Sequence, residues 1–241
     1  MKTEIKRHDY SERNWCVEFK LPDHIMSYLW ERIERGKEDN IDWKTQLAGN
    51  ISTSISLRDP DEIICKNIFS NLYKAGVRFD PIIDSAYKQI IKPNAIDGKL
   101  VRPDMVLIPQ LGAFWANFQK KHEFNPLHDH SGMFSFVIWM DIPYSWEEER
   151  KNPIARGTME DVIGNFTTVF SDGDEVRYQT WKMSPEMNGT MLVFPANMKH
   201  QVYPFYTTDK ERISISGNVY YVNEKLDNHP LSEVKLPGYG V

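Results

Sequence analysis

Hydrophobic and polar residues follow different patterns in the two halves of this 241-residue chain. From Met105 onward, short apolar or alternating runs are separated by turn-forming residues, a pattern that predicts strands. The expected strands are 105–108, 113–118, 134–141, 166–170, 175–181, 190–194, 201–205 and 212–222. Eight such strands predict a mostly β protein with a double-stranded β-helix core, a jelly-roll architecture.

The last of these strands, 212–222, separates polar from aliphatic residues by alternation. One face carries the polar residues Arg212, Ser214, Ser216 and Asn218. The aliphatic residues Ile213, Ile215 and Val219 lie mainly on the other face. Successive side chains of a strand point to opposite faces. The pattern therefore predicts a polar face that lines a cavity and an apolar face packed under covering helices. The alternative is a polar face turned to water at a sheet surface.

The first hundred residues show helical spacing instead. The segments expected to be regular are a strand at 15–19 and helices at 23–35, 63–75 and, more weakly, 81–91, with 47–57 extended or looped. Asp23 is the expected cap of the first helix, and the acidic, proline-containing segment 59–62 is expected to open the second. Both helices would flank the β core.

We therefore predict a single domain in three parts. A helical and extended support region (1–100) precedes the double-stranded β-helix core (101–223), and a C-terminal tail (224–241) follows it. The charged segment 145–158 interrupts the core and is read as a solvated loop, with a lid over the site as the alternative.

Composition and charge narrow the class of protein. Hydrophobic residues at 41% and charged residues at 26% are ordinary for a globular domain. A net charge of −5 makes a nucleic-acid partner unexpected. Two cysteines, Cys16 and Cys65, are too few for a disulfide framework. Because no signal-like or membrane-spanning apolar segment occurs, we expect a cytoplasmic protein without a membrane partner. Its oligomeric state is left open.

Two histidines one residue apart, His128 and His130, are the main candidates for chemistry. In an extended segment both side chains project from one face and can converge on one metal ion. A third ligand has to come from elsewhere, and His200 is the best candidate. Imidazole suits zinc, iron, copper or nickel, and an incomplete ligand set with open positions suits iron(II) oxygen chemistry. Since no thiolate is nearby, a structural zinc site is not expected.

Arg212 lies twelve residues beyond His200, on the predicted polar face. Its guanidinium fork can bind a carboxylate through two hydrogen bonds. Three asparagines, Asn117, Asn125 and Asn218, are further candidates that could orient a substrate or a water in the pocket.

Through His128, His200 and the pair Arg212-x-Ser214, residues 105–222 resemble the 2-oxoglutarate- and iron(II)-dependent dioxygenases, and among them the prolyl-hydroxylase-like proteins of phages and bacteria. The resemblance implies iron(II), 2-oxoglutarate as cosubstrate, dioxygen and a substrate that is hydroxylated. It implies that Arg212 and Ser214 bind the distal carboxylate of 2-oxoglutarate. It favours a protein or peptide side chain or a free amino acid as substrate, with a modified base as a further option. A phage origin would make the compartment the host cytoplasm.

One position departs from the family pattern. Where the family has a carboxylate two residues after the first histidine, this chain has His130, and the nearby acid is Asp129. Three outcomes follow: iron held by three histidines, which we favour; Asp129 as a substitute ligand at an irregular strand end; or a catalytically silent site.

Two other readings compete with the oxygenase. A cupin would share the His-x-His pair, but residues 131–141 lack the glutamate that the first cupin motif requires, and a cupin has no need of Arg212. A non-catalytic jelly-roll protein, for binding or for assembly into a virion, would bind no metal and would make the Arg212 face an accident.

Overall fold

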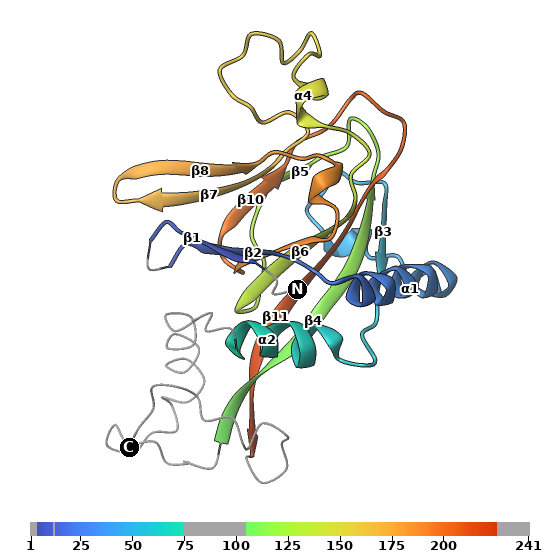
Figure 1. The fold of residues 1–241 in the computed structure, drawn as a ribbon, viewed down its shortest axis with the longest axis vertical. Coiled ribbons are helices and arrows are strands. Elements are labelled where there is room, and N and C mark those ends of the chain that lie inside the picture. The colour runs from blue at the N-terminus through green and yellow to red at the C-terminus, as the bar shows by residue number, and fades with distance from the viewer. Residues whose placement is uncertain (1–3, 12, 75–104, 226–241) are drawn as a thin grey trace.

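The computed structural model describes residues 4–11, 13–74 and 105–225 (Figure 1). The end of the second expected helix, the expected helix at 81–91 and the tail from 226 lie outside these residues. In the described part of the chain, no helix is long and apolar enough to cross a membrane.

Two antiparallel sheets form the core of the described chain. The larger sheet has seven strands in the order β1 (Ile5–Asp9), β2 (Trp15–Lys20), β9 (Thr190–Pro195), β6 (Phe134–Asp141), β11 (Arg212–Lys225), β4 (Met105–Gln119) and β3 (Thr53–Ser56). The smaller sheet has the order β5 (Asn125–His128), β10 (Lys199–Val202), β7 (Phe166–Asp172) and β8 (Glu175–Trp181). The predicted mostly β fold with a jelly-roll core and flanking helices is confirmed.

Alternation along the strands of the larger sheet produces two hydrophobic cores. On β2, Val17 faces the helices whereas Cys16 faces the smaller sheet, and each belongs to a separate buried cluster. On β11, Ile215 is fully buried on the helix side, while Arg212 opens toward the other sheet. The polar face of β11 thus lines a cavity between the sheets, as its alternation predicted.

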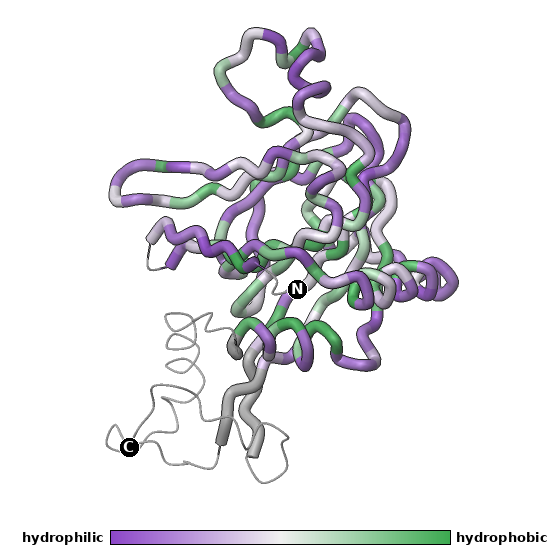
Figure 2. The backbone as a smooth tube through the Cα atoms, viewed as in Figure 1, coloured by the Kyte–Doolittle hydropathy of each residue, from purple (hydrophilic) through white to green (hydrophobic). Residues whose placement is uncertain are grey.

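Two helical segments cover the outer face of the larger sheet (Figures 1 and 2). Helix α1 (Asp23–Asp39) buries one stripe, Ile25, Leu29 and Ile33, and Figure 2 shows hydrophilic positions along its outward turns. The expected cap by Asp23 is wrong, because Pro22 occupies the cap position and no side chain bonds the first turn. The helix also runs four residues past 35 and ends at Asn40, whose left-handed conformation lets its N–H bond Gly36.

The second helix begins with a π-helical segment, η2 (Ile63–Phe69), and continues as α2 (Ser70–Lys74). Its start is set by Asp59, whose carboxylate accepts hydrogen bonds from the N–H groups of Ile63 and Ile64 at 3.0 and 2.9 Å. The acidic segment therefore caps this helix from outside and does not form its first turn.

Several strands differ from the expected ones. The segments 105–108 and 113–118 form one strand, β4, because β11 pairs with it along its whole length and an irregularity opposite Gly112 absorbs the turn-like residues. β10 ends at Val202, since Pro204 follows and lacks a donor. β1 and β5 were not among the expected strands. Together, β1, β2 and β3 make the N-terminal part of the chain an integral part of the larger sheet.

Candidate metal centre

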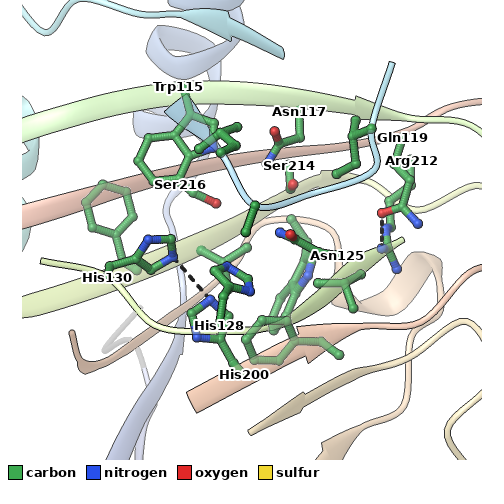
Figure 3. Close-up of a pocket in the computed structure, with 18 of the residues that line it drawn as sticks. Trp115, Asn117, Gln119, Asn125, His128, His130, His200, Arg212, Ser214 and Ser216 are labelled. Atoms are coloured by element: carbon green, nitrogen blue, oxygen red, sulfur yellow. Dashed lines mark hydrogen bonds between the residues drawn. The ribbon is translucent and has the colours of Figure 1, made fainter. Parts of the chain in front are cut away.

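A cavity of about 210 Å³ lies between the two sheets (Figure 3). Its apolar wall includes Val137, Trp139, Phe166 and Phe194, and its polar wall includes Asn117, Gln119, Asn125, Ser214, Ser216, Arg212 and the three histidines. Gln46, Leu47, Ala48 and Ile51 close one side from the N-terminal part of the chain. A partly enclosed hollow in which polar side chains converge beside an apolar wall is typical of a small-molecule site.

The three histidines predicted as ligands come together in this cavity. His128 is the last residue of β5 and lies directly opposite His200 of β10. His130 lies just past the strand end, where its N–H donates to the carbonyl of Ala196 at 2.9 Å. One ligand nitrogen from each ring lies within 4.8 Å of the others. Figure 3 shows the three rings gathered at one end of the cavity.

Carbonyl groups fix two of the rings for metal binding. Nδ1 of His128 lies 2.7 Å from the Pro126 carbonyl, and Nδ1 of His200 lies 3.1 Å from the Met198 carbonyl. A carbonyl can only accept, so Nδ1 carries the proton in both rings and Nε2 keeps its lone pair. Metal-binding histidines are commonly oriented in this way.

The spacing of the nitrogens suits a metal ion. Nε2 of His130 lies 3.2 Å from Nε2 of His200. Two nitrogens bound about 2.1 Å from one metal at right angles would lie about 3 Å apart. The donor set therefore fits a metal held by three imidazoles, with further positions open to other ligands.

Burial keeps the three imidazoles neutral. It lowers the pKa of His128, and it lowers the pKa of His200 well below its ordinary value. Burial, followed by the neighbouring His128, lowers the pKa of His130 to about 4. Neutral imidazole is the form that binds a metal, so the cluster is ready to do so at neutral pH.

Asp129 faces away from the histidine cluster. Its carboxylate lies 2.6 Å from Nζ of Lys199, and both side chains are about half exposed. The hydrogen bond from Lys199 holds the pKa of Asp129 below its usual range. Although Asp129 contributes to the rim of the cavity, its carboxylate is not part of the cluster. The placement gives no support to Asp129 as a substitute ligand.

Arg212 lies at the other end of the cavity and is 3% exposed. Its Nη1 donates to the hydroxyl of Tyr144 at 2.6 Å and to the carbonyl of Gly164 at 3.1 Å, and its Nη2 donates to Oε1 of Gln119. All three acceptors are neutral. In the described part of the chain, no carboxylate lies within ion-pair distance of Arg212.

Cross-strand pairs connect the two ends of the cavity. Three polar residues of β11 lie directly opposite three residues of β4: Arg212 opposite Gln119, Ser214 opposite Asn117, and Ser216 opposite Trp115. The last pair reaches the histidines, because the rings of Trp115 and His130 lie 5.7 Å apart. Both Ser214 and Ser216 line the cavity beside the guanidinium.

The three candidate asparagines have different positions. Asn117 lines the cavity and accepts a hydrogen bond from Ser54 at 2.7 Å. Asn125 also lines it, and its Oδ1 is buried with no partner in the described residues. Asn218 does not belong to the lining, and its Oδ1 accepts a hydrogen bond from the buried Ser135 at 2.8 Å.

Sequence reasoning missed two residues that bond the arginine and a buried glutamate in the charged segment. Gln119 and Tyr144 bond Arg212 directly. Glu149 is fully buried and accepts hydrogen bonds from the N–H groups of Tyr206 and Thr207, both at 2.9 Å. Glu149 belongs to α4 (Trp146–Glu149), so the charged segment 145–158 is anchored at its start. No signal in the sequence points to this role, because nothing distinguishes Glu149 from the neighbouring glutamates until its burial is known.

Comparison with known proteins agrees with this geometry. Residues 113–218 match the model of a family described as "Putative 2OG-Fe(II) oxygenase". This region contains the histidine cluster and the Arg212 face. No curated protein matches the chain.

Two solved structures share low similarity with the chain. An oxidoreductase of the 2OG-Fe(II) oxygenase family from Burkholderia pseudomallei is 18% identical and covers 48% of this chain and 45% of its own length, with a TM-score of 0.32. A prolyl-4-hydroxylase from Pseudomonas putida is 15% identical and covers 84% of this chain and 90% of its own length, with a TM-score of 0.42. The chain thus spans less than half of the first protein.

One cavity of this β-sandwich thus combines a histidine cluster with the spacing of a metal site and a buried arginine that can pair with an anion. The matched region, residues 113–218, is thus similar to 2OG-Fe(II) oxygenases, a family named for iron(II) and 2-oxoglutarate. The phage origin stays a prediction.

Proposed function

We propose that the protein is a 2-oxoglutarate-dependent hydroxylase in which His128, His130 and His200 hold iron(II) while Arg212 and Ser214 bind the distal carboxylate of the cosubstrate. The observation that carries this proposal is the buried Arg212 without a carboxylate partner in the described residues. A buried charge without a counter-ion is costly, so an anionic ligand is its expected partner. Iron(II) at the histidines would supply dioxygen activation, coupled to oxidation of 2-oxoglutarate to succinate and carbon dioxide.

The separation of the two ends supports a dicarboxylate. Arg212 and Ser216 are four residues apart on β11, which corresponds to roughly 13 Å of strand. The histidines lie near the Ser216 end. Because the Arg212 side chain and a metal held by the histidines would both extend into the cavity, the distance between them is shorter than this backbone separation. A five-carbon dicarboxylate would place one carboxylate on the guanidinium and its 2-oxo acid end toward the histidines. Ser214, between the two ends, can donate to the distal carboxylate.

The apolar walls of the cavity exclude water from the histidine end, which the reaction also requires. Phe166 and Phe194 pack against His200, with ring centroids 5.6 and 4.9 Å from its ring. Such an apolar surround limits water near the reacting atoms and strengthens the electrostatic contact at Arg212. The chain thus contributes orientation and water exclusion, while the cofactor supplies the oxidation.

For the substrate we propose a protein or peptide side chain or an amino acid. The similarity of His128, His200 and Arg212-x-Ser214 to the pattern of the prolyl-hydroxylase-like proteins supports this class of substrate.

The proposal is tested by anaerobic titration of the apoprotein with iron(II) and then with 2-oxoglutarate. The expected result is the weak visible charge-transfer band of a chelated 2-oxo acid, with Arg212→Gln requiring far more cosubstrate than the wild type. Iron binding without the band would favour a cupin, and absence of iron binding would favour a non-catalytic binding protein.

The substrate class is tested separately, once the band is seen. Peptide and amino-acid libraries are incubated with enzyme, iron(II), 2-oxoglutarate and oxygen, and products one oxygen atom heavier are sought by mass spectrometry. Succinate formation that is stimulated by a modified nucleobase and by no peptide or amino acid would contradict this substrate class.

A further inference from the structure

The orientation of Arg212 depends on a residue outside the expected carboxylate clamp. Gln119 is the last residue of β4 and lies directly opposite Arg212 across the strand pair. It is 3% exposed and lines the cavity. Its Oε1 accepts a hydrogen bond from Nη2 of Arg212.

A second hydrogen bond fixes which way the Gln119 amide faces. Nε2 of Gln119 donates to the backbone carbonyl of Glu123 at 2.6 Å. A carbonyl can only accept, so the amide nitrogen has to face Glu123 and the amide oxygen has to face the guanidinium. The carboxylate of Glu123 accepts from the N–H of Lys120 at 2.9 Å and of Ser52 at 3.0 Å, which holds the turn in place.

Gln119 therefore orients the guanidinium without neutralising it. The bonds to Tyr144, Gly164 and Gln119 use three of the five N–H donors of Arg212. The Nε–H and one Nη2 hydrogen have no partner in the described residues. Glutamate has the same size as glutamine, but its carboxylate would bring a negative charge next to Nη2 of Arg212. That charge would repel the ligand carboxylate expected at the guanidinium.

We propose that Gln119 is a positioning residue for the cosubstrate: its neutral, fixed amide presents Arg212 to the distal carboxylate and preserves the positive charge that attracts it. This rests on the proposed function, since it assigns 2-oxoglutarate to the Arg212 end of the cavity. Selectivity for an anion here comes as much from the lack of a competing carboxylate among the described residues as from the arginine.

The test compares Gln119→Glu with Gln119→Leu in the iron(II)-loaded protein under anaerobic conditions. Binding of 2-oxoglutarate is measured by calorimetry, iron(II) binding is measured separately, and the unfolding midpoint of each apoprotein is recorded. Gln119→Glu should weaken 2-oxoglutarate binding at least ~30-fold, because like charges in a desolvated site repel strongly. Gln119→Leu, which adds no charge, should weaken it only ~3- to 10-fold, as expected for one lost hydrogen bond.

Stability should follow the opposite order. Gln119→Leu removes the hydrogen bond from Nη2 of Arg212 and the one to the Glu123 carbonyl, whereas Gln119→Glu keeps an acceptor for Arg212. The leucine variant should therefore have the lower unfolding midpoint, and both variants should bind iron(II) as the wild type does. A purely structural role would make the loss of affinity follow the loss of stability.

Arg212→Gln separates failure of this inference from failure of the proposed function. If Gln119→Glu binds 2-oxoglutarate within ~3-fold of the wild type while Arg212→Gln binds it poorly, the inference about Gln119 is overturned and the proposed function stands. If Arg212→Gln also binds normally, or if the wild type binds no 2-oxoglutarate, both are overturned.

Discussion

Replacing His130 and Asp129 separately by alanine decides which of them is the third metal ligand. His130 lies in the cluster with His128 and His200, whereas Asp129 is turned toward Lys199. The two truncations are matched, because each removes one side chain of the same loop past β5. We expect His130→Ala to abolish tight metal binding and Asp129→Ala to leave it nearly unchanged.

The exposed ion pair limits what Asp129 can contribute. The side chains of Asp129 and Lys199 are 43% and 52% exposed, and such pairs contribute about 0.2–1 kcal/mol. Asp129→Ala should therefore change the affinity for metal by less than about 5-fold. Loss of a residue that merely orients a ligand costs about 10–100-fold, so loss of the ligand His130 should cost at least about 100-fold.

Competition titration against a fluorescent chelator under anaerobic conditions measures both affinities. Lys199→Gln is a useful control, because it frees Asp129 without removing it; affinity should again stay within about 5-fold. A 100-fold loss in Asp129→Ala, with near-normal binding in His130→Ala, would show that Asp129 is the ligand and would refute this assignment.

Three further predictions concern stability. Burial lowers the pKa of His130 to about 4 from about 6.5 in the unfolded chain, so the unfolded state binds more protons between these two pH values. The free energy of unfolding of the apoprotein, measured by urea denaturation, should therefore fall as the pH drops from about 6.5 to about 4. His130→Gln should show a smaller fall. Glu149→Gln should cost about 2 kcal/mol in the same assay, because a buried carboxylate that accepts two backbone hydrogen bonds becomes a neutral amide; an unchanged midpoint would contradict this. Gly217→Ala should lower stability by about 1–3 kcal/mol, since its Cβ would lie 2.6 Å from Cζ of Phe136 and 3.0 Å from the Ala113 carbonyl oxygen; thermal denaturation measures the change.

Strands with a strong hydrophobic pattern could be predicted from the sequence, and weakly patterned ones could not. The apolar run 134–141 coincides with β6 (Phe134–Asp141), and the alternation after Arg212 correctly assigned the two faces of β11. β1 has a single aliphatic residue, Ile5, and β5 has four residues including Pro126. Those short strands exist because neighbours pair with them, which depends on tertiary structure.

Some residues of the candidate site could likewise be predicted from the sequence, whereas others depend on the tertiary structure. The histidines and Arg212 carry a chemistry that their residue types reveal, and the structure brings the histidines together at one end of the cavity and Arg212 at the other. Gln119 and Tyr144 are common residue types whose roles come from register and loop path. Gln119 meets Arg212 only because β4 and β11 pair in this alignment, and Tyr144 is 68 positions away in the chain.

The two halves of the site belong to different sheets. His128 and His200 lie on β5 and β10 of the smaller sheet, whereas Arg212 lies on β11 of the larger one. A cosubstrate bound at both ends would act as a non-covalent cross-link between the sheets. By mass action, a ligand at 100 times its dissociation constant adds about 2.7 kcal/mol to the free energy of unfolding. The protein's resistance to unfolding and proteolysis should therefore rise and fall with the supply of iron(II) and 2-oxoglutarate, which links its abundance to the metabolic state of the cell.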